Sequence, residues 1–184
     1  ILPIAPLFNA IEQFNQLDRQ VTLHLSDEVL GGSWDALVAD RCDLTIGAGG
    51  EVPKGQFEYR PIGEVEFVFA VAASHPLAVR KEAVDQEAIR DLPAVIVADS
   101  SRSAPSRSAG FLDSRQIIRV ASMQAKLEAQ LMGLGVGFLP RHIANSALLS
   151  GELIALPCNI PRPNMPAYMA WRKDNNGRAL RWFI

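Results

Sequence analysis

The chain has 184 residues, of which 48% are hydrophobic, and its 18 basic and 20 acidic residues leave a net charge of −2. This length and hydrophobic content suffice for one large domain or two small lobes with buried cores. The charge is nearly balanced and no cluster of lysine or arginine stands out, which argues against DNA binding by this segment alone. No apolar run reaches the length needed to cross a membrane, so we expect no membrane contact.

The two cysteines and the first residues of the sequence limit which kinds of site and which targeting segments can be expected. Cys42 and Cys158 lie in unrelated contexts, and a disulfide or metal site would need partners that their spacing does not offer. We therefore interpret both as small buried hydrophobes. The first residues, ILPIAPLF, lack the basic start of a signal peptide and an initiator methionine, so we expect the sequence to be a fragment of a longer protein.

The first fifty residues are predicted to alternate helices and strands. Apolar residues recur every three to four positions over 4–17, which indicates an amphipathic helix, and alternate over 21–25, which indicates a strand. Ser33 is expected to cap a second helix, and 43–48 to form a second strand. The glycines at 47–50 are interpreted as a tight turn, because no phosphate-binding motif follows them. Since no strand precedes the first helix, we expect the chain to begin one strand late.

The middle of the chain is predicted to be mostly extended. Two extended runs, 57–62 and 64–72, lead to S-H-P-L at 74–77. His75 is expected to form a local hydrogen bond rather than to act in catalysis, because it precedes a proline in an extended turn. A short helix is expected over 84–92.

A buried strand and its following loop come next. The continuous apolar run AVIVA at 94–98 suits a strand that is buried on both faces. Residues 99–110 are rich in Ser, Arg and Pro without periodicity. Because the first three of them follow a parallel strand, we expect Asp99, Ser100 and Ser101 to line a ligand cleft, and the remainder to be solvated surface.

The last third of the chain begins with a strand, a helix and a strand over 117–140, which form a parallel unit with a right-handed crossover. Ser122 is expected to cap the helix over 123–134, whose apolar face would carry leucines 127, 131 and 134. Glycines would then end that helix. The further predicted elements are a helix at 141–149, strands at 153–156 and 165–171, and a helix at 179–184.

These segments, in this order, resemble the effector-binding domain of LysR-type transcriptional regulators. The most specific parts are the capped helix with G-L-G-V-G-F-L-P at 133–140, S-H-P-L at 74–77 and M-P-A-Y-M-A-W-R-K at 165–173. The resemblance spans essentially the whole chain and implies an α/β fold of the type II periplasmic-binding-protein kind, with mainly parallel sheets flanked by helices in two lobes. The first lobe would comprise residues 1–62 and 172–184, and the second lobe residues 72–165. Crossover strands at 63–71 and 166–171 would connect the two lobes.

The resemblance also implies a function. The chain would be the ligand-sensing domain of a bacterial regulator, binding a small organic effector between the lobes to control DNA binding and transcription. It would be cytoplasmic, form a homodimer or homotetramer, and contact DNA only through an N-terminal helix-turn-helix domain outside this sequence. The alternative is a periplasmic solute-binding receptor of a transport system, which shares the fold. We expect no enzyme activity, metal or cofactor, because no metal-ligand spacing, nucleotide loop or G-x-S-x-G motif occurs.

Effector-binding residues are expected at the carboxyl ends of the parallel strands, where such sheets bind ligands. The free N–H groups of the helix behind Ser122 would attract a carboxylate or similar group, although a purely structural cap is an equally good interpretation. Leu30, Met123 and Phe138 would form an apolar wall for an aromatic or alkyl body. The carboxylate of Asp99 would repel an anion unless it points away or meets a donor on the ligand. The expected set is Glu28, Leu30, Gly31, Ala48, Gly49, Asp99, Ser100, Ser101, Ser122, Met123, Gly137 and Phe138.

Overall fold

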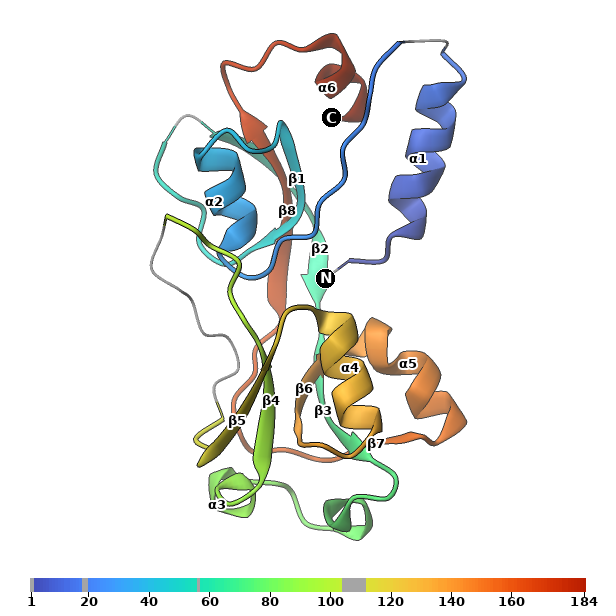
Figure 1. Ribbon diagram of the computed structural model, residues 1–184, viewed down its shortest axis with the longest axis vertical. Coiled ribbons are helices and arrows are strands. Elements are labelled where there is room, and N and C mark those ends of the chain that lie inside the picture. Colours follow the sequence, from blue (N-terminus) through green and yellow to red (C-terminus); the bar gives the residue numbers. More distant parts are fainter. Residues whose placement is uncertain (1, 18–19, 56, 104–111) are drawn as a thin grey trace.

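The computed structural model describes residues 2–17, 20–55, 57–103 and 112–184. These residues form an upper and a lower part, each built on a β-sheet (Figure 1). The upper sheet has the order β1-β8-β2, with β1 (Leu44–Gly49), β8 (Met165–Arg172) and β2 (Phe57–Val65). The lower part has β6 (Gly137–Pro140), β3 (Phe67–Ala72) and β7 (Leu153–Ala155) in the order β6-β3-β7, and the pair β4 (Pro93–Val97) and β5 (Gln116–Val120).

Strand direction within each part is uniform except for one strand. β8 runs antiparallel to β1 and β2, and β3 runs antiparallel to β6 and β7. β4 and β5 are parallel, and a parallel bridge between Ala94 and Val136 links β4 to the residue before β6. Most strands in each part therefore point the same way, as predicted. Most of the ladders are nevertheless antiparallel, because the reversed strand lies between two others.

Helices cover these sheets. In the described ranges they are α1 (Ala5–Asn15), α2 (Gly32–Val38), α3 (Gln86–Ile89), α4 (Met123–Leu131), α5 (Arg141–Ser150) and α6 (Arg178–Phe183), with a 3₁₀ turn at Pro76–Val79. α4 and α5 lie side by side against the lower sheet (Figure 1). α2 packs against β1 and buries Trp34 and Leu37 beside Ala48 and Ala170. The upper and lower parts therefore each have a core of their own.

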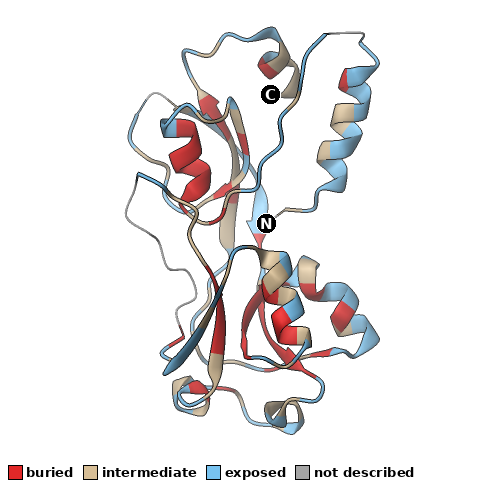
Figure 2. Ribbon diagram, viewed as in Figure 1, coloured by how far each residue is buried: buried red, intermediate tan, exposed pale blue. Residues whose placement is uncertain are grey.

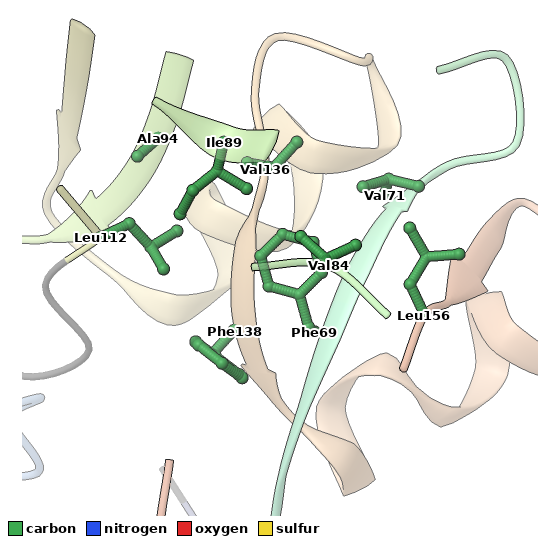
Figure 3. Close-up of a cluster of buried hydrophobic side chains, with 9 residues drawn as sticks. All are labelled: Phe69, Val71, Val84, Ile89, Ala94, Leu112, Val136, Phe138 and Leu156. Carbon is green, nitrogen blue, oxygen red and sulfur yellow. The ribbon is translucent and has the colours of Figure 1, made fainter. Parts of the chain in front are cut away.

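The main apolar core of the lower part lies on the face of β3 that carries Phe69 and Val71. Phe69 and Phe138 meet edge to face there, with ring centroids 5.4 Å apart. Because successive strand residues point to opposite faces, Val68 and Ala70 join a second cluster beneath α4 and α5. Figure 3 shows the first core, which consists of Phe69, Val71, Val84, Ile89, Ala94, Leu112, Val136, Phe138 and Leu156.

Burial is uneven along the molecule. Figure 2 shows buried residues concentrated in α2 and in the strands of the lower part, whereas β2 is exposed along most of its length. α1 stands apart from the sheets (Figure 1). Within α1 only Phe14 is buried, with its ring 5.2 Å from that of Trp182 and 5.0 Å from that of Phe183 in α6. Phe8 of α1 is exposed, whereas Leu7 and Ile11 are half-buried.

The structure corrects several sequence predictions. Residues 21–25 are mostly exposed and form no strand, because no described strand pairs with them. Ser33 does not cap α2, which begins behind Gly31 without a side-chain cap. The helix expected at 84–92 is only α3, because the Asp85 side chain caps it and Val84 bridges instead to Cys158. Residues 104–110 of the predicted surface loop lie outside the described residues.

Other predictions are confirmed. Leu77 donates its N–H to Nδ1 of His75 at 3.1 Å, which is the expected local hydrogen bond. Gly133 adopts a φ of +71° directly after α4, where a residue with a side chain would be strained. The buried face of α4 differs from the prediction, however. It consists of Lys126, Ala129 and Gln130, while Leu127 and Leu131 are half-buried and Leu134 is exposed.

Candidate functional site

Two segments far apart in the sequence meet where the upper part faces the lower part. Ser100 lies in the segment that follows β4, and its hydroxyl donates to Oε2 of Glu28 at 2.5 Å. The N–H of Val29 donates to Oγ of Ser100 at 2.8 Å, and the N–H of Ser100 donates to the carbonyl of Val29 at 3.2 Å. The loop before α2 and the segment behind β4 are thus joined by both side-chain and backbone hydrogen bonds.

An ion-pair network extends this junction. Arg41 donates from Nη1 to Oε1 of Glu28 and from Nη2 to Oδ2 of Asp35, each at 2.7 Å. Asp35 also accepts the N–H groups of Arg102 at 3.0 Å and Ser103 at 3.1 Å. We call Glu28, Asp35, Arg41 and Ser100, with these two N–H groups, the junction network.

Asp35 is the most enclosed acid of the junction network, since its side chain is only 3% exposed. The N–H of Arg102 is the largest influence on its pKa, which falls from 3.8 to about 2, with further lowering by Arg41 and Ser103 outweighing the opposing effect of burial. Hydrogen bonds to a carboxylate favour its charged form. Asp35 therefore stays ionised at neutral pH and ties α2 to the segment behind β4.

Glycine is required at position 32 by the approach of Ser100. A β-carbon on Gly32 would lie 1.9 Å from Oγ of Ser100 and 2.7 Å from Oε2 of Glu28. The neighbouring Leu30 has a φ of +54°, which residues with a side chain rarely adopt. The tight turn over 30–32 thus leaves the space in which Ser100 meets Glu28.

The N-terminus of α4 is capped as predicted. Oγ of Ser122 accepts the N–H of Ala125 at 3.1 Å, and Ser122 itself has extended backbone angles. Met123, the first residue of α4, is half-buried. Ser122 therefore acts as the N-terminal cap of α4.

The buried face of α4 is polar. Nε2 of Gln130 donates to the carbonyls of Ala70 at 2.7 Å and Gly137 at 3.1 Å. One turn earlier, Lys126 is only 6% exposed. Burial, assisted by the nearby charge of Arg162, lowers the pKa of Lys126 to about 7. A lysine amine therefore lies buried between α4 and the lower sheet.

The other expected site residues have packing roles or local bonds. Ala48 is fully buried, and the carbonyl of Gly49 accepts Nε1–H of Trp34 at 3.0 Å. The ring of Phe138 packs in the core, so it is not kept as a ligand wall. Oδ1 of Asp99 accepts both the N–H and the hydroxyl of Ser101, at 2.8 and 2.7 Å, so this carboxylate meets a local donor.

The structure brings together some of the residues that the sequence predicts for the effector site. Glu28, Gly31 and Ser100 were expected near one another, and their segments meet in the junction network. Gly32, Asp35, Arg41 and Lys126 were not among the predicted residues. The double glycine at 31–32 was the available signal for Gly32. Asp35 of α2 and Arg41 in the turn after it could not be distinguished by sequence from ordinary surface charges.

Other kinds of site are not formed by the residues that the structure describes. No group of three His, Cys, Asp or Glu among them is placed to hold a metal. Cys42 and Cys158 are both free and half-buried rather than fully buried. No helix in the described ranges is long and apolar enough to span a membrane. A shallow hollow of about 350 Å³ lies over β2 and β8, where it is lined by Phe57, Glu58, Tyr59, Arg60, Trp171 and Lys173.

Comparison with known proteins identifies the class and then the family. The architecture is that of the type II periplasmic-binding-protein-like fold, shared with solved effector-binding domains. Residues 4–184 match the family model described as the LysR substrate binding domain, and the chain belongs to this family. The uncharacterized HTH-type transcriptional regulator YeeY of Escherichia coli (strain K12) is 36% identical over 181 residues, covering 98% of this chain and 58% of that protein. This chain thus spans less than two thirds of the relative.

Two solved structures show the same fold with ligands bound. The effector binding domain of QuiR in complex with shikimate has a TM-score of 0.67 and 19% identity, covering 96% of this chain and 86% of that one. The CcmR regulatory domain of Synechocystis PCC6803 in complex with 2-PG has a TM-score of 0.70 and 17% identity, with coverage of 96% and 86%. At these identities the likeness concerns the fold. YeeY is named as a transcriptional regulator.

Proposed function

We propose that this chain is the effector-sensing part of a bacterial LysR-type transcriptional regulator. It binds a small organic molecule between two lobes and thereby controls DNA binding and transcription. The family match over residues 4–184 is the observation that carries this proposal. A relative named as a transcriptional regulator favours it over the alternative of a periplasmic receptor.

The first lobe that we propose comprises residues 1–62 and 172–184, and the second comprises residues 72–165. The crossovers between them lie at 63–71 and 166–171. One support for this division is that β2 ends at Val65 and β3 begins at Phe67 in the other sheet. β8, which contains the second proposed crossover, pairs along its length with β1 and β2. The junction network then lies across the boundary between the lobes.

The effector that we propose is a small organic acid, held between the junction network and the N-terminus of α4. The N–H groups of a helix terminus attract negative charge, by roughly 0.3–1 kcal/mol when exposed. Ser100 and Ser101 add hydroxyl groups from the segment behind β4, and Leu30 and Met123 add apolar surface. Because a ligand shifts lobe positions only if it prefers one arrangement, an effector that competes for Ser100 would loosen the junction.

The assembly that we propose is a homodimer or homotetramer in the cytoplasm. Its subunits lie side by side and antiparallel, so that α1 of one meets α4 of the other. Phe8 of α1 is 49% exposed and Met132 behind α4 is 74% exposed, which supports a further apolar contact at both surfaces. A two-fold pair uses each such surface twice. DNA is contacted through a separate helix-turn-helix domain, since this segment has a net charge of −2.

A reporter experiment tests this function. The full-length protein that contains this chain is expressed with its promoter fused to a reporter gene, and small organic acids are supplied one at a time. At least one acid is expected to change transcription, and the same acid should raise the melting temperature of residues 1–184. A domain that binds such an acid while the full-length protein leaves every tested promoter unaffected would contradict the regulatory role.

A further inference from the structure

A lysine lies on the buried face of α4, next to the capped terminus of this helix. The N–H of Lys126 donates to the carbonyl of Ser122 at 3.1 Å, which places this lysine one turn inside the helix. Its Nζ lies 3.2 Å from the position that a β-carbon would take on Gly137. The missing side chain of Gly137 therefore leaves the space that the ammonium occupies between α4 and β6.

The ammonium of Lys126 has no hydrogen bond or ion pair within the part of the chain that the structure describes. Lysine is almost never this buried unless it is paired, because an uncompensated charge loses its hydration. On the same face of α4, Oε1 of Gln130 is also buried without a hydrogen-bond partner among the described residues. This region thus offers one buried amine, and among the described residues no acid forms an ion pair with it.

A second cation lies nearby. The guanidinium of Arg162 is stacked over the ring of Phe67, 3.9 Å from its centroid. Its Nε is buried and finds no hydrogen-bond acceptor in the described ranges. The charge of Arg162 is close enough to lower the pKa of Lys126. Two poorly solvated cations repel each other, and an anion beside them would remove that repulsion.

We propose that Lys126 binds the anionic group of the effector, with Arg162 as a second source of positive charge. This inference rests on the proposed function and assigns the effector to the organic anions, either carboxylates or phosphate esters. The capped terminus of α4 supplies N–H groups at the same end of the helix. Gly137, expected from sequence to lie in the site, serves by leaving room for Lys126 rather than by touching the effector.

The charge state of Lys126 gives a direct readout. Its pKa of about 7 without a ligand means that much of the amine is neutral at neutral pH. An opposite charge within about 4–6 Å favours the charged form, so a bound anion should raise this pKa by about one pH unit or more. β3, β4 and β6 carry no titratable side chain, and Arg119 of β5 and Arg141 and His142 of α5 are exposed. The guanidinium of an arginine keeps its charge in proteins. Lys126 is therefore the group expected to take up the proton.

The experiment follows the ε-carbon resonance of Lys126 by NMR during pH titrations of residues 1–184. The probes are acetate, benzoate and inorganic phosphate, with benzamide as an uncharged partner of benzoate and chloride to match ionic strength. The Lys126→Met variant assigns the resonance, and Lys81→Met removes an exposed lysine as a control. We expect at least one anion to raise the pKa of Lys126, and benzamide to leave it unchanged. Acetate or benzoate acting alone would indicate a carboxylate, and phosphate acting alone a phosphate ester.

Several outcomes would overturn the inference. A pKa of Lys126 that none of the anions alters, or that benzamide alters as much as benzoate does, would contradict it. In the reporter assay, Lys126→Met should weaken the response to the active acid at least tenfold, whereas Lys81→Met should not. A full response in Lys126→Met would overturn this inference while leaving the proposed function intact. Anion binding at Lys126 without any transcriptional response would instead contradict the proposed function alone.

Discussion

Ser100 and Glu28 are 72 residues apart in the sequence, yet the hydroxyl of the first donates to the carboxylate of the second at 2.5 Å. The same serine accepts the N–H of Val29. The small side chain of Ser100 therefore holds the segment that follows β4 against the loop that precedes α2. A ligand that enters between these segments has to replace, share or reinforce this contact.

Replacement of Ser100 by alanine should destabilise the folded chain. The change leaves the N–H of Val29 and one oxygen of Glu28 without their partner, and an unsatisfied buried polar group costs about 1–3 kcal/mol. Urea unfolding would measure the free energy of unfolding. Ser146→Ala, at an exposed position of α5, serves as the control. Equal stability of the two variants would show that the contact between Ser100 and Glu28 contributes nothing.

Gly32→Ala should disrupt the same contact by steric overlap. The new β-carbon would lie 1.9 Å from Oγ of Ser100, and overpacking of this kind typically costs about 1–3 kcal/mol. In the double variant with Ser100→Ala the oxygen is gone, so the two losses should not add. A double-mutant cycle of unfolding free energies measures this coupling. Strict additivity would mean that Gly32 and Ser100 do not constrain each other.

Acid should weaken the junction network through Asp35. Its pKa in the folded chain, about 2, is below the ordinary value of 3.8. A depressed carboxyl pKa stabilises the fold above the unfolded pKa, and this stabilisation is lost as the pH falls from about 4 towards 2. The urea midpoint of Asp35→Asn should therefore be lower than that of the wild type at pH 7 and should change less over this acid range. The exposed Asp113→Asn is the control, and an identical pH profile for Asp35→Asn and the wild type would contradict this role.

The capping role of Ser122 and its proposed contact with the ligand should be separable by mutation. Ser122→Ala should cost about 1 kcal/mol, and Ser122→Gly only a few tenths, because glycine tolerates the cap position. Thermal unfolding measures this difference. Calorimetric titration of Ser122→Gly with the active acid then reports on the ligand contact alone. Unchanged affinity in both Ser122→Gly and Ser100→Ala would mean that the effector binds elsewhere.

Dimerisation of the isolated chain should depend on α1. The wild type is expected to sediment as a dimer at micromolar concentration, and Phe8→Glu should shift it towards the monomer, because a charge would be buried in the contact. Val79→Glu, which changes an exposed apolar residue outside α1 and α4, is the control. A wild-type monomer at high concentration, or a Phe8→Glu dimer as tight as the wild type, would contradict the proposed interface.

The periodicity of apolar residues and the conformational propensities of the residues were sufficient to predict most of the helices and strands. The apolar runs at 94–98 and 117–140 became β4, β5, α4 and β6, because burial on both faces or on one helical stripe leaves a clear pattern. Residues 21–25 had the alternation of a strand, but none of the described strands pairs with them to form a ladder. Strand formation depends on such a partner, which a local pattern does not contain.

The site was harder to predict because its contacts are long-range. Asp35 and Arg102 are 67 residues apart, and their hydrogen bond depends on how α2 meets the segment behind β4. Lys126 was hidden by the leucines beside it, which suggested the wrong buried face for α4. The absence of a side chain at Gly137 leaves room for this lysine. Residue types at strand ends therefore indicated where the junction network lies but not its charged members Asp35 and Arg41.

The most direct test of the proposed function is a calorimetric titration of residues 1–184 with the organic acid that is active in the reporter assay. The wild type should bind one molecule per chain, and Ser100→Ala and Lys126→Met should each bind at least tenfold more weakly, while Ser146→Ala and Lys81→Met bind normally. An acid that controls transcription through the full-length protein but does not bind residues 1–184 would contradict the assignment of effector sensing to this chain.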